Sequence, residues 1–212
     1  MKDVDIYAPA DKAIKTMNRD ALREFGKLKL ADFDKLNVIQ TVKTLYRTQK
    51  QKARRRYFEI GFEVYLLGLY LAGSNGKRAY EMAEKAISVE WVDMLLKGID
   101  PVTMFRFETE TDRKAERLAE IIEAAPAPAR EIDRAVVLWS KQLGQYALNT
   151  TDEAVKKAYK DAGVELVKWV TAGDERVCEE CGPLDGKIFK LEEVPPKPHR
   201  NCRCRLYPVR RD

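Results

Sequence analysis

Histidine is almost absent from this sequence, and cysteine is scarce. The 212 residues include one histidine and four cysteines. A single histidine excludes a catalytic zinc helix of the HExxH type, and the sequence also has no Gly-rich phosphate-binding loop. No nucleophile stands beside a recognisable base. We therefore expect a protein that is not an enzyme and that has no small-molecule substrate.

Long apolar runs are absent as well. The most apolar stretch, residues 57–72, is interrupted by Glu59 and Glu63 and is too short to cross a bilayer. The chain starts Met-Lys-Asp-Val-Asp, with no apolar segment behind the lysine, so we expect no signal peptide. These absences predict a protein without a membrane partner.

The remaining composition is that of an ordinary globular protein. Hydrophobic residues make up 45% of the chain and charged residues 34%, which excludes a disordered protein. The net charge of +5 is compatible with a nucleic-acid or acidic-protein neighbour but does not require one. Cysteines confined to one window suit a reducing compartment better than a secreted disulfide scaffold.

Apolar residues at three- and four-residue steps predict a mainly helical N-terminal and central region. Shorter helices are expected over residues 9–28, 77–87, 88–97, 111–124 and 132–149, with a further one from Thr151 to about Gly163. The longest pattern, from Asp32 to Ala72, predicts a long helix that packs lengthwise against a neighbour; Asp32 or Asp34 can cap it. Residues 102–107 alternate apolar and polar side chains, as a short extended segment does. The Asp100-Pro101 break predicts a helical arm over residues 1–100 and a second domain over residues 101–212, with helices in 108–162.

The pattern changes from helical to alternating after residue 163. Residues 164–171, 186–191 and 202–209 each predict a strand. A small antiparallel sheet over residues 163–212 is the economical arrangement. The predicted fold class is therefore α+β: mainly helical with a long helix, plus a small C-terminal antiparallel β-sheet that carries a zinc-knuckle-like Cys/His cluster. Such a sheet buries little, so an ion is expected to tie its loops.

All cysteines and the only histidine lie between residues 178 and 204. Cys178 and Cys181 are separated by two residues, and Gly182 and Pro183 permit a tight turn in which both sulfurs point at one ion. The second group of candidates is His199, Cys202 and Cys204. Soft sulfur together with imidazole predicts zinc, and paired groups at this spacing are a strong zinc signal.

A tetrahedral zinc ion needs four ligands, and this window offers more. Cys202 and Cys204 are two apart, and on a regular strand they would face opposite ways. We therefore expect Cys178, Cys181, His199 and Cys202 to bind, with Cys204 as the substitute. Four protein ligands leave no open position, so the zinc is expected to be structural. The alternatives are disulfides, or reduced core thiols beside a histidine held in one tautomer.

Basic residues cluster in the middle of the longest predicted helix and near the end of the chain. The two clusters contain Arg47, Lys50, Lys52, Arg54, Arg55 and Arg56, and then Arg203 and Arg205. One interpretation is a solvated helix face. The other is contact with nucleic-acid phosphate or with an acidic partner surface.

Residues 163–204 carry a series of short motifs. The series comprises Gly163-Val-Glu-Leu-Val-Lys-Trp169, Cys178 and Cys181, Leu184-Asp-Gly186, and Pro195-Pro196 ahead of His199-Arg-Asn-Cys-Arg-Cys204. It resembles the C-terminal domain of minor head proteins of tailed bacteriophages, the Mu F-like head-morphogenesis family. Upstream, Arg113-Lys114 and the segment with Gln145, Ala147 and Asn149 are similar to the family's central helical region. The chain departs at Lys197-Pro198, since the family more often runs directly from its prolines to the histidine, and Arg200 follows where the family has proline.

The resemblance implies a structural minor capsid protein of low copy number, located in the virion at the capsid interior or the portal vertex, and in the host cytoplasm during assembly. It implies the portal protein or the major capsid protein as partner, packaged DNA near the basic surface, and a role in head morphogenesis and DNA packaging or delivery. Asp174 and Asp185 are then turn formers beside the metal knuckle, and Arg176 braces one of them. The alternative function is a stand-alone zinc-knuckle protein that binds nucleic acid through Lys187, Arg200, Arg203 and Arg205.

Overall fold

The computed structural model describes residues 4–30, 37–98, 100, 106–125, 128–171 and 178–209. Within these residues the helices are α1 (Ala8–Leu30), α2 (Val38–Leu71), α3 (Gly76–Ala86), α4 (Val89–Lys97), α5 (Phe107–Ala124) and α6 (Ala129–Asp161). The strands are β1 (Leu166–Val170), β2 (Ile188–Lys190) and β3 (Arg205–Pro208). Two 3-10 turns, η1 (Gly182–Leu184) and η2 (Leu191–Glu193), flank β2. The predicted α+β class, mostly helical with a small C-terminal sheet, is confirmed.

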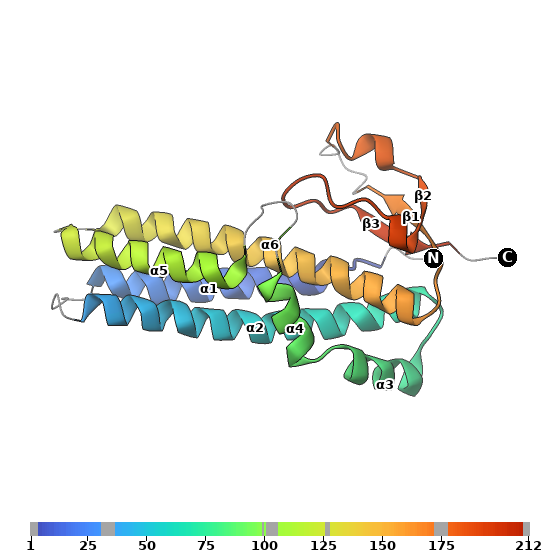
Figure 1. The fold of residues 1–212 in the computed structure, drawn as a ribbon, viewed down its shortest axis with the longest axis horizontal. Coiled ribbons are helices and arrows are strands. Elements are labelled where there is room, and N and C mark those ends of the chain that lie inside the picture. Colours follow the sequence, from blue (N-terminus) through green and yellow to red (C-terminus); the bar gives the residue numbers. More distant parts are fainter. Residues whose placement is uncertain are drawn as a thin grey trace.

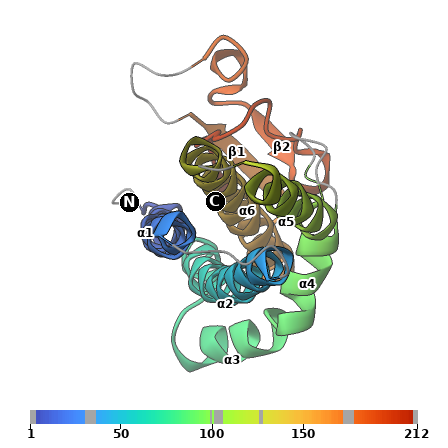
Figure 2. The same ribbon diagram turned by 90° about the vertical axis from the view of Figure 1, so that its left-hand side faces the viewer.

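The helices α1, α2, α5 and α6 run side by side along the long axis of the molecule (Figures 1 and 2). α6 contacts each of the other three, and α2 contacts both α1 and α5. α3 packs against the outer side of α2, and α4 contacts α2, α5 and α6 (Figure 2). Among the described residues, none of the helices combines the length and the apolar character that a membrane span requires.

Aromatic rings from all four long helices fill the bundle interior. Phe107 and Trp139 are fully buried, with ring centroids 5.8 Å apart. Tyr146 contacts Phe107 edge-on at 5.0 Å, and Tyr46 contacts Trp139 at 5.5 Å. Phe25 of α1 packs on Tyr46 at 5.2 Å. Each such ring contributes about 1.5–3 kcal/mol by burial, so the helices have a core that does not depend on the sheet.

Two glycines let α2 approach its neighbours closely. A Cβ atom at Gly68 would lie 2.7 Å from the Cβ of Ala158 on α6, and one at Gly61 would lie 2.7 Å from the indole ring of Trp91 on α4. Both distances are shorter than real Cβ contacts. Glycine within a helix costs stability because its helix propensity is low, and the close packing at these two positions offsets that cost.

The sheet is antiparallel, with strand order β2-β1-β3. Lys168 of β1 lies opposite Ile188 of β2 and Tyr207 of β3. Val167 and Trp169, on the other face of β1, are fully buried. The sheet lies against the C-terminal part of α6, where the Tyr159 hydroxyl donates to the carbonyl oxygen of Leu206 at 2.9 Å (Figure 1). This packing holds the cysteine-bearing loops at one end of the bundle.

The predicted break near residues 149–151 is wrong, because α6 runs without interruption from Ala129 to Asp161. The hydroxyls of Thr150 and Thr151 donate to the carbonyl oxygens of Tyr146 and Ala147, one turn back, at 2.7 and 3.1 Å. Both threonines are buried and find their partners within the helix. Neither therefore acts as a helix cap.

Three other boundaries shift. Phe107 starts α5 and does not end an extended segment, and residues 102–105 of that predicted segment lie outside the described residues. β3 starts at Arg205, later than the predicted start at Cys202. α2 starts at Val38, and the predicted caps Asp32 and Asp34 lie outside the described residues.

Helices from both sides of the predicted boundary at residue 100 share the bundle interior, since α1 and α2 contact α6. The division into residues 1–100 and 101–212 stays a prediction.

Candidate metal centre

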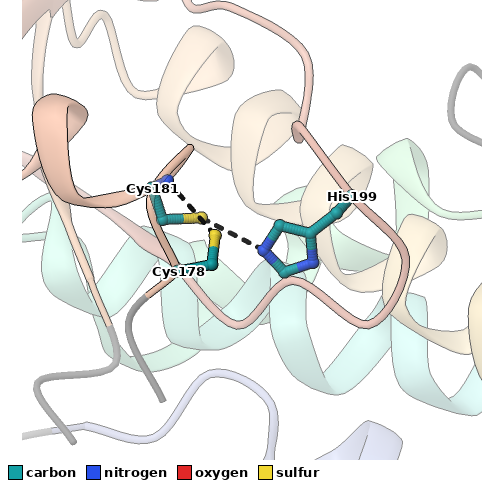
Figure 3. Close-up of side chains that lie close together, drawn as sticks. All are labelled: Cys178, Cys181 and His199. Atoms are coloured by element: carbon teal, nitrogen blue, oxygen red, sulfur yellow. Dashed lines mark hydrogen bonds between the residues drawn. The ribbon is translucent and has the colours of Figure 1, made fainter. Parts of the chain in front are cut away.

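The first two cysteines lie in one tight turn. The carbonyl oxygen of Cys178 accepts hydrogen bonds from the N–H groups of Cys181 at 3.1 Å and of Gly182 at 2.9 Å. The Cys181 N–H also points at the Cys178 sulfur, 3.3 Å away. Gly182 and Pro183 then enter η1. Both sulfurs point from this turn toward His199 (Figure 3).

The other three candidates lie on the loop between η2 and β3. Asn201 has φ of 58°, a left-handed conformation that asparagine adopts more readily than most residues, and its N–H donates to the side-chain oxygen of Gln145 at 3.1 Å. Beside this bend, His199 faces the first turn, with Nε2 3.2 Å from the Cys181 sulfur (Figure 3). Nδ1 lies 2.8 Å from the carbonyl oxygen of Arg200. A proton on Nδ1 donated to that carbonyl leaves Nε2 free to bind a metal.

The ligand atoms form two overlapping triplets. Those of Cys178, Cys181 and His199 lie within 4.8 Å of one another, and so do those of Cys181, Cys202 and Cys204. The Cys181 sulfur belongs to both triplets and lies 3.7 Å from the Cys202 sulfur. In a tetrahedral site with zinc–sulfur bonds of about 2.3 Å, neighbouring sulfurs lie about 3.8 Å apart. The separation of Cys181 and Cys202 therefore matches one edge of such a tetrahedron.

The expectation that Cys202 and Cys204 face opposite ways is wrong. Both residues precede β3, so the alternation of a regular strand does not apply to them. Each is only 3% exposed, and both sulfurs approach that of Cys181. All four cysteines are free thiols, so the structure does not contain the alternative disulfides.

Burial disfavours the charged thiolate form of these cysteines when no cation is bound. It raises the pKa of the Cys181 thiol to about 12. The pKa of Cys202 is raised mainly by its hydrogen bond to the Cys204 sulfur and then by burial, and the same hydrogen bond lowers the pKa of Cys204. Metals bind the thiolate form, and a divalent cation supplies the charge that favours it. Donor type, spacing and burial thus fit a metal ion.

Most of the basic residues that the sequence singles out form ion pairs within the chain. The pairs are Lys50–Asp112, Arg54–Asp93, Arg55–Glu59, Arg56–Glu59, Arg203–Asp11 and Arg205–Asp5. Arg47 and Lys52 are exposed and form no ion pair within the described part of the chain. These pairs favour the solvated, internally paired helix face, and contact with nucleic acid or a partner stays a prediction.

Asp185 joins the end of β1 to the turn before β2. Its carboxylate accepts hydrogen bonds from the N–H of Thr171 at 2.8 Å and from the Thr171 hydroxyl at 3.1 Å. These two bonds lower the pKa of the Asp185 carboxyl. Asp174 and Arg176, the other expected turn residues, lie outside the described residues.

The sequence did not predict the residues that support the second ligand loop, which is residues 194–204 with His199, Cys202 and Cys204. The side chains of Tyr7 and Lys197 both contact the carbonyl oxygen of Cys204, and Asp152 of α6 contacts Tyr7. No spacing links positions so far apart in the chain. The one sequence signal is Lys197-Pro198, where the chain departs from the Mu F-like pattern.

Part of the chain matches a known protein family. Residues 112–207 match the family described as Phage Mu protein F like protein. No curated protein and no solved structure matches the chain. The matched range is somewhat less than half of the 212 residues and contains α6, β1, β2 and all five candidate ligands. The resemblance carried by the motifs is therefore confirmed over residues 112–207, where this chain is similar to the phage Mu protein F like family.

Proposed function

We propose that this protein is a structural minor head protein of a tailed bacteriophage that acts in head morphogenesis and in DNA packaging or delivery. The observation that carries this proposal is the Mu F-like domain over residues 112–207. That domain supplies both α6, which contacts every other long helix, and the cysteine-bearing loops. It is thus an integral part of the fold and not an appendage. The proposed location is the virion, at the capsid interior or the portal vertex.

The proposed partners are the portal protein and the major capsid protein of the same phage. Co-expression of this chain with each of them separately, followed by affinity pull-down, tests the proposal. We expect co-purification with at least one of the two. Deletion of the chain from the phage genome is expected to yield defective or DNA-poor heads, whereas normal heads at full infectious titre would refute a role in head assembly.

We further propose that the Cys/His cluster binds a structural zinc ion. Four of the five candidates, Cys178, Cys181, His199, Cys202 and Cys204, would hold it and leave no position for substrate. The ion would then have only a structural role, which is to hold the two cysteine-bearing loops together. Structural zinc contributes about 10–16 kcal/mol of apparent binding free energy, which is large beside the small core of a three-stranded sheet. Metal analysis of the purified chain is expected to give one zinc per chain.

Binding of double-stranded DNA separates this proposal from a stand-alone nucleic-acid-binding protein. A minor head protein near packaged DNA is expected to bind weakly and without sequence preference. Tight binding that falls steeply with salt would favour the alternative. The pairing of Arg203 with Asp11 at 2.7 Å and of Arg205 with Asp5 at 3.2 Å supports the first outcome, since both cations already have carboxylate partners.

A further inference from the structure

A polar network lies directly behind the second ligand loop. The hydroxyl of Tyr7 lies 2.6 Å from a carboxylate oxygen of Asp152 on α6 and 2.9 Å from the carbonyl oxygen of Cys204. The ammonium group of Lys197 donates to the Tyr7 hydroxyl oxygen at 3.0 Å and also to the Cys204 carbonyl oxygen. It lies 3.5 Å from Asp152. These contacts join three distant parts of the chain at one backbone carbonyl.

The number of protons on each donor decides which acceptor it hydrogen-bonds to. A tyrosine hydroxyl has one proton, and its shorter contact is with Asp152. Lys197 has three protons, which suffice for the Cys204 carbonyl, the Tyr7 oxygen and Asp152. Tyr7 is 2% exposed, and the side chains of Asp152 and Lys197 are each 14% exposed. Little water therefore competes for these bonds.

Lys197 connects both parts of the second ligand loop. Its backbone stands two residues before His199, while its ammonium group holds the carbonyl of Cys204. The same ammonium group lies over the ring of Trp169 at 5.0 Å, which fixes the side chain against β1. A site of one zinc ion, three thiolates and one neutral imidazole carries a formal charge of −1, and a nearby ammonium favours that charge.

The N-terminal segment, residues 4–11, is fastened to this loop and to β3 by further contacts. Arg203 pairs with Asp11 at 2.7 Å, and Arg205 pairs with Asp5 at 3.2 Å. The Tyr207 hydroxyl donates to the carbonyl oxygen of Val4 at 3.5 Å. The segment therefore packs against the backbone that carries Cys202 and Cys204.

We propose that Tyr7, Asp152 and Lys197 are positioning residues for the metal centre, and that docking of the N-terminal segment and metal binding strengthen each other. This inference rests on the proposed structural zinc. Because the linkage is reciprocal, whatever loosens the segment lowers metal affinity, and metal loss loosens the segment by the same factor.

The test measures Zn²⁺ affinity by competition with a chromophoric chelator in the full chain. Tyr7→Phe keeps the ring and removes the hydroxyl, and Lys197→Met removes the charge at similar length. Loss of a residue that orients a metal ligand typically lowers affinity about 10–100-fold. We expect each variant to lose at least about tenfold and to shift the Co²⁺ absorption spectrum, and Lys197→Arg to recover part of the loss.

Tyr65→Phe is the matched control. Tyr65 is fully buried and donates to Asp161 of α6 at 2.7 Å, as Tyr7 donates to Asp152, but it comes from α2. We expect Tyr65→Phe to lower stability while leaving Zn²⁺ affinity and the Co²⁺ spectrum unchanged. In the unsubstituted chain, Zn²⁺ is expected to slow amide hydrogen exchange of residues 4–11.

The outcomes separate the two proposals. If the unsubstituted chain binds Zn²⁺ and the Tyr7 and Lys197 variants bind it equally well, the positioning role is refuted while the zinc proposal stands. If the unsubstituted chain binds no Zn²⁺, both are refuted. Should Tyr7→Phe fail to fold, Lys197→Met, whose backbone lies in a surface loop, decides the question alone.

Discussion

At the scale of single residues, Cys181 has the central position in the candidate metal centre. Its sulfur lies 3.2 Å from His199 Nε2 and 3.7 Å from the Cys202 sulfur, so it touches both halves of the cluster. The other candidates each belong to one triplet. Removal of Cys181 therefore disconnects the halves, while removal of Cys204 leaves Cys202 to complete a set of four.

Serine substitutions test this difference. Cys181→Ser is expected to abolish stoichiometric zinc binding, because no second thiol spans the two triplets. Cys204→Ser is expected to keep one zinc per chain, with a Co²⁺ spectrum typical of three thiolates. The measurement is metal content after desalting, with Co²⁺ absorption as the second readout. A full equivalent of zinc in Cys181→Ser would contradict the arrangement described here.

The Asp185 carboxylate gives a prediction for pH dependence. Hydrogen bonds from Thr171 lower its pKa in the folded chain. A carboxyl whose pKa is lower in the folded than in the unfolded chain stabilises the fold above its unfolded pKa of about 3.9. That contribution disappears as the pH falls through the folded value. Asp185→Asn removes it at every pH.

The free energies of unfolding of the unsubstituted chain and of Asp185→Asn should therefore differ by a constant amount between about pH 5 and 7 and converge below about pH 4. Urea titrations at several pH values measure this difference. A gap that persists undiminished into strong acid would show that the charge of Asp185 does not stabilise the fold.

At the scale of elements, the close contact between α2 and α6 depends on the glycine at position 68. Gly68→Ala places a methyl group 2.7 Å from the Cβ of Ala158, and such overpacking costs about 1–3 kcal/mol. Gly26→Ala is the control, because a Cβ built at Gly26 in α1 meets nothing within 4 Å apart from its chain neighbours and the backbone of its own helix. There the gain in helix propensity should stabilise by about 0.5–1 kcal/mol. Denaturant unfolding should thus give opposite signs for the two substitutions, and equal signs would refute the packing argument.

At the scale of the whole molecule, the sequence predicts the fold class, most of the elements and the cluster of ligands. Strong apolar periodicity predicts α1 and α2. The spacing of the cysteines and the histidine predicts that two groups of candidate ligands lie close together. The sequence-based predictions are wrong where a tertiary contact overrides a local sequence pattern. Threonine often caps helices, but Thr151 is buried inside α6. Cys202 lies before β3, whereas the alternating pattern predicts it within that strand. Tyr7 and Lys197 meet only because the chain folds back on itself, which no local pattern encodes.

Chelation tests how the two parts of the molecule depend on metal. The bundle has its own aromatic core around Phe107 and Trp139, whereas Trp169 lies in β1 of the small sheet. Removal of zinc should therefore change the near-UV circular dichroism of Trp169 while the far-UV helix signal persists. Unchanged near-UV dichroism, or loss of both signals in one transition, would contradict a sheet that relies on the ion.

The hydrogen bond between Val4 and Tyr207 brings the first and last described segments together beside the sheet (Figure 1). A short linker could therefore join them without disturbing a helix, and the chain could be reopened at exposed Asn75, between α2 and α3. Such a circular permutant would present both new ends beside α3. A label attached there would report on the protein's surroundings from a different face than one attached beside Val4 or Tyr207.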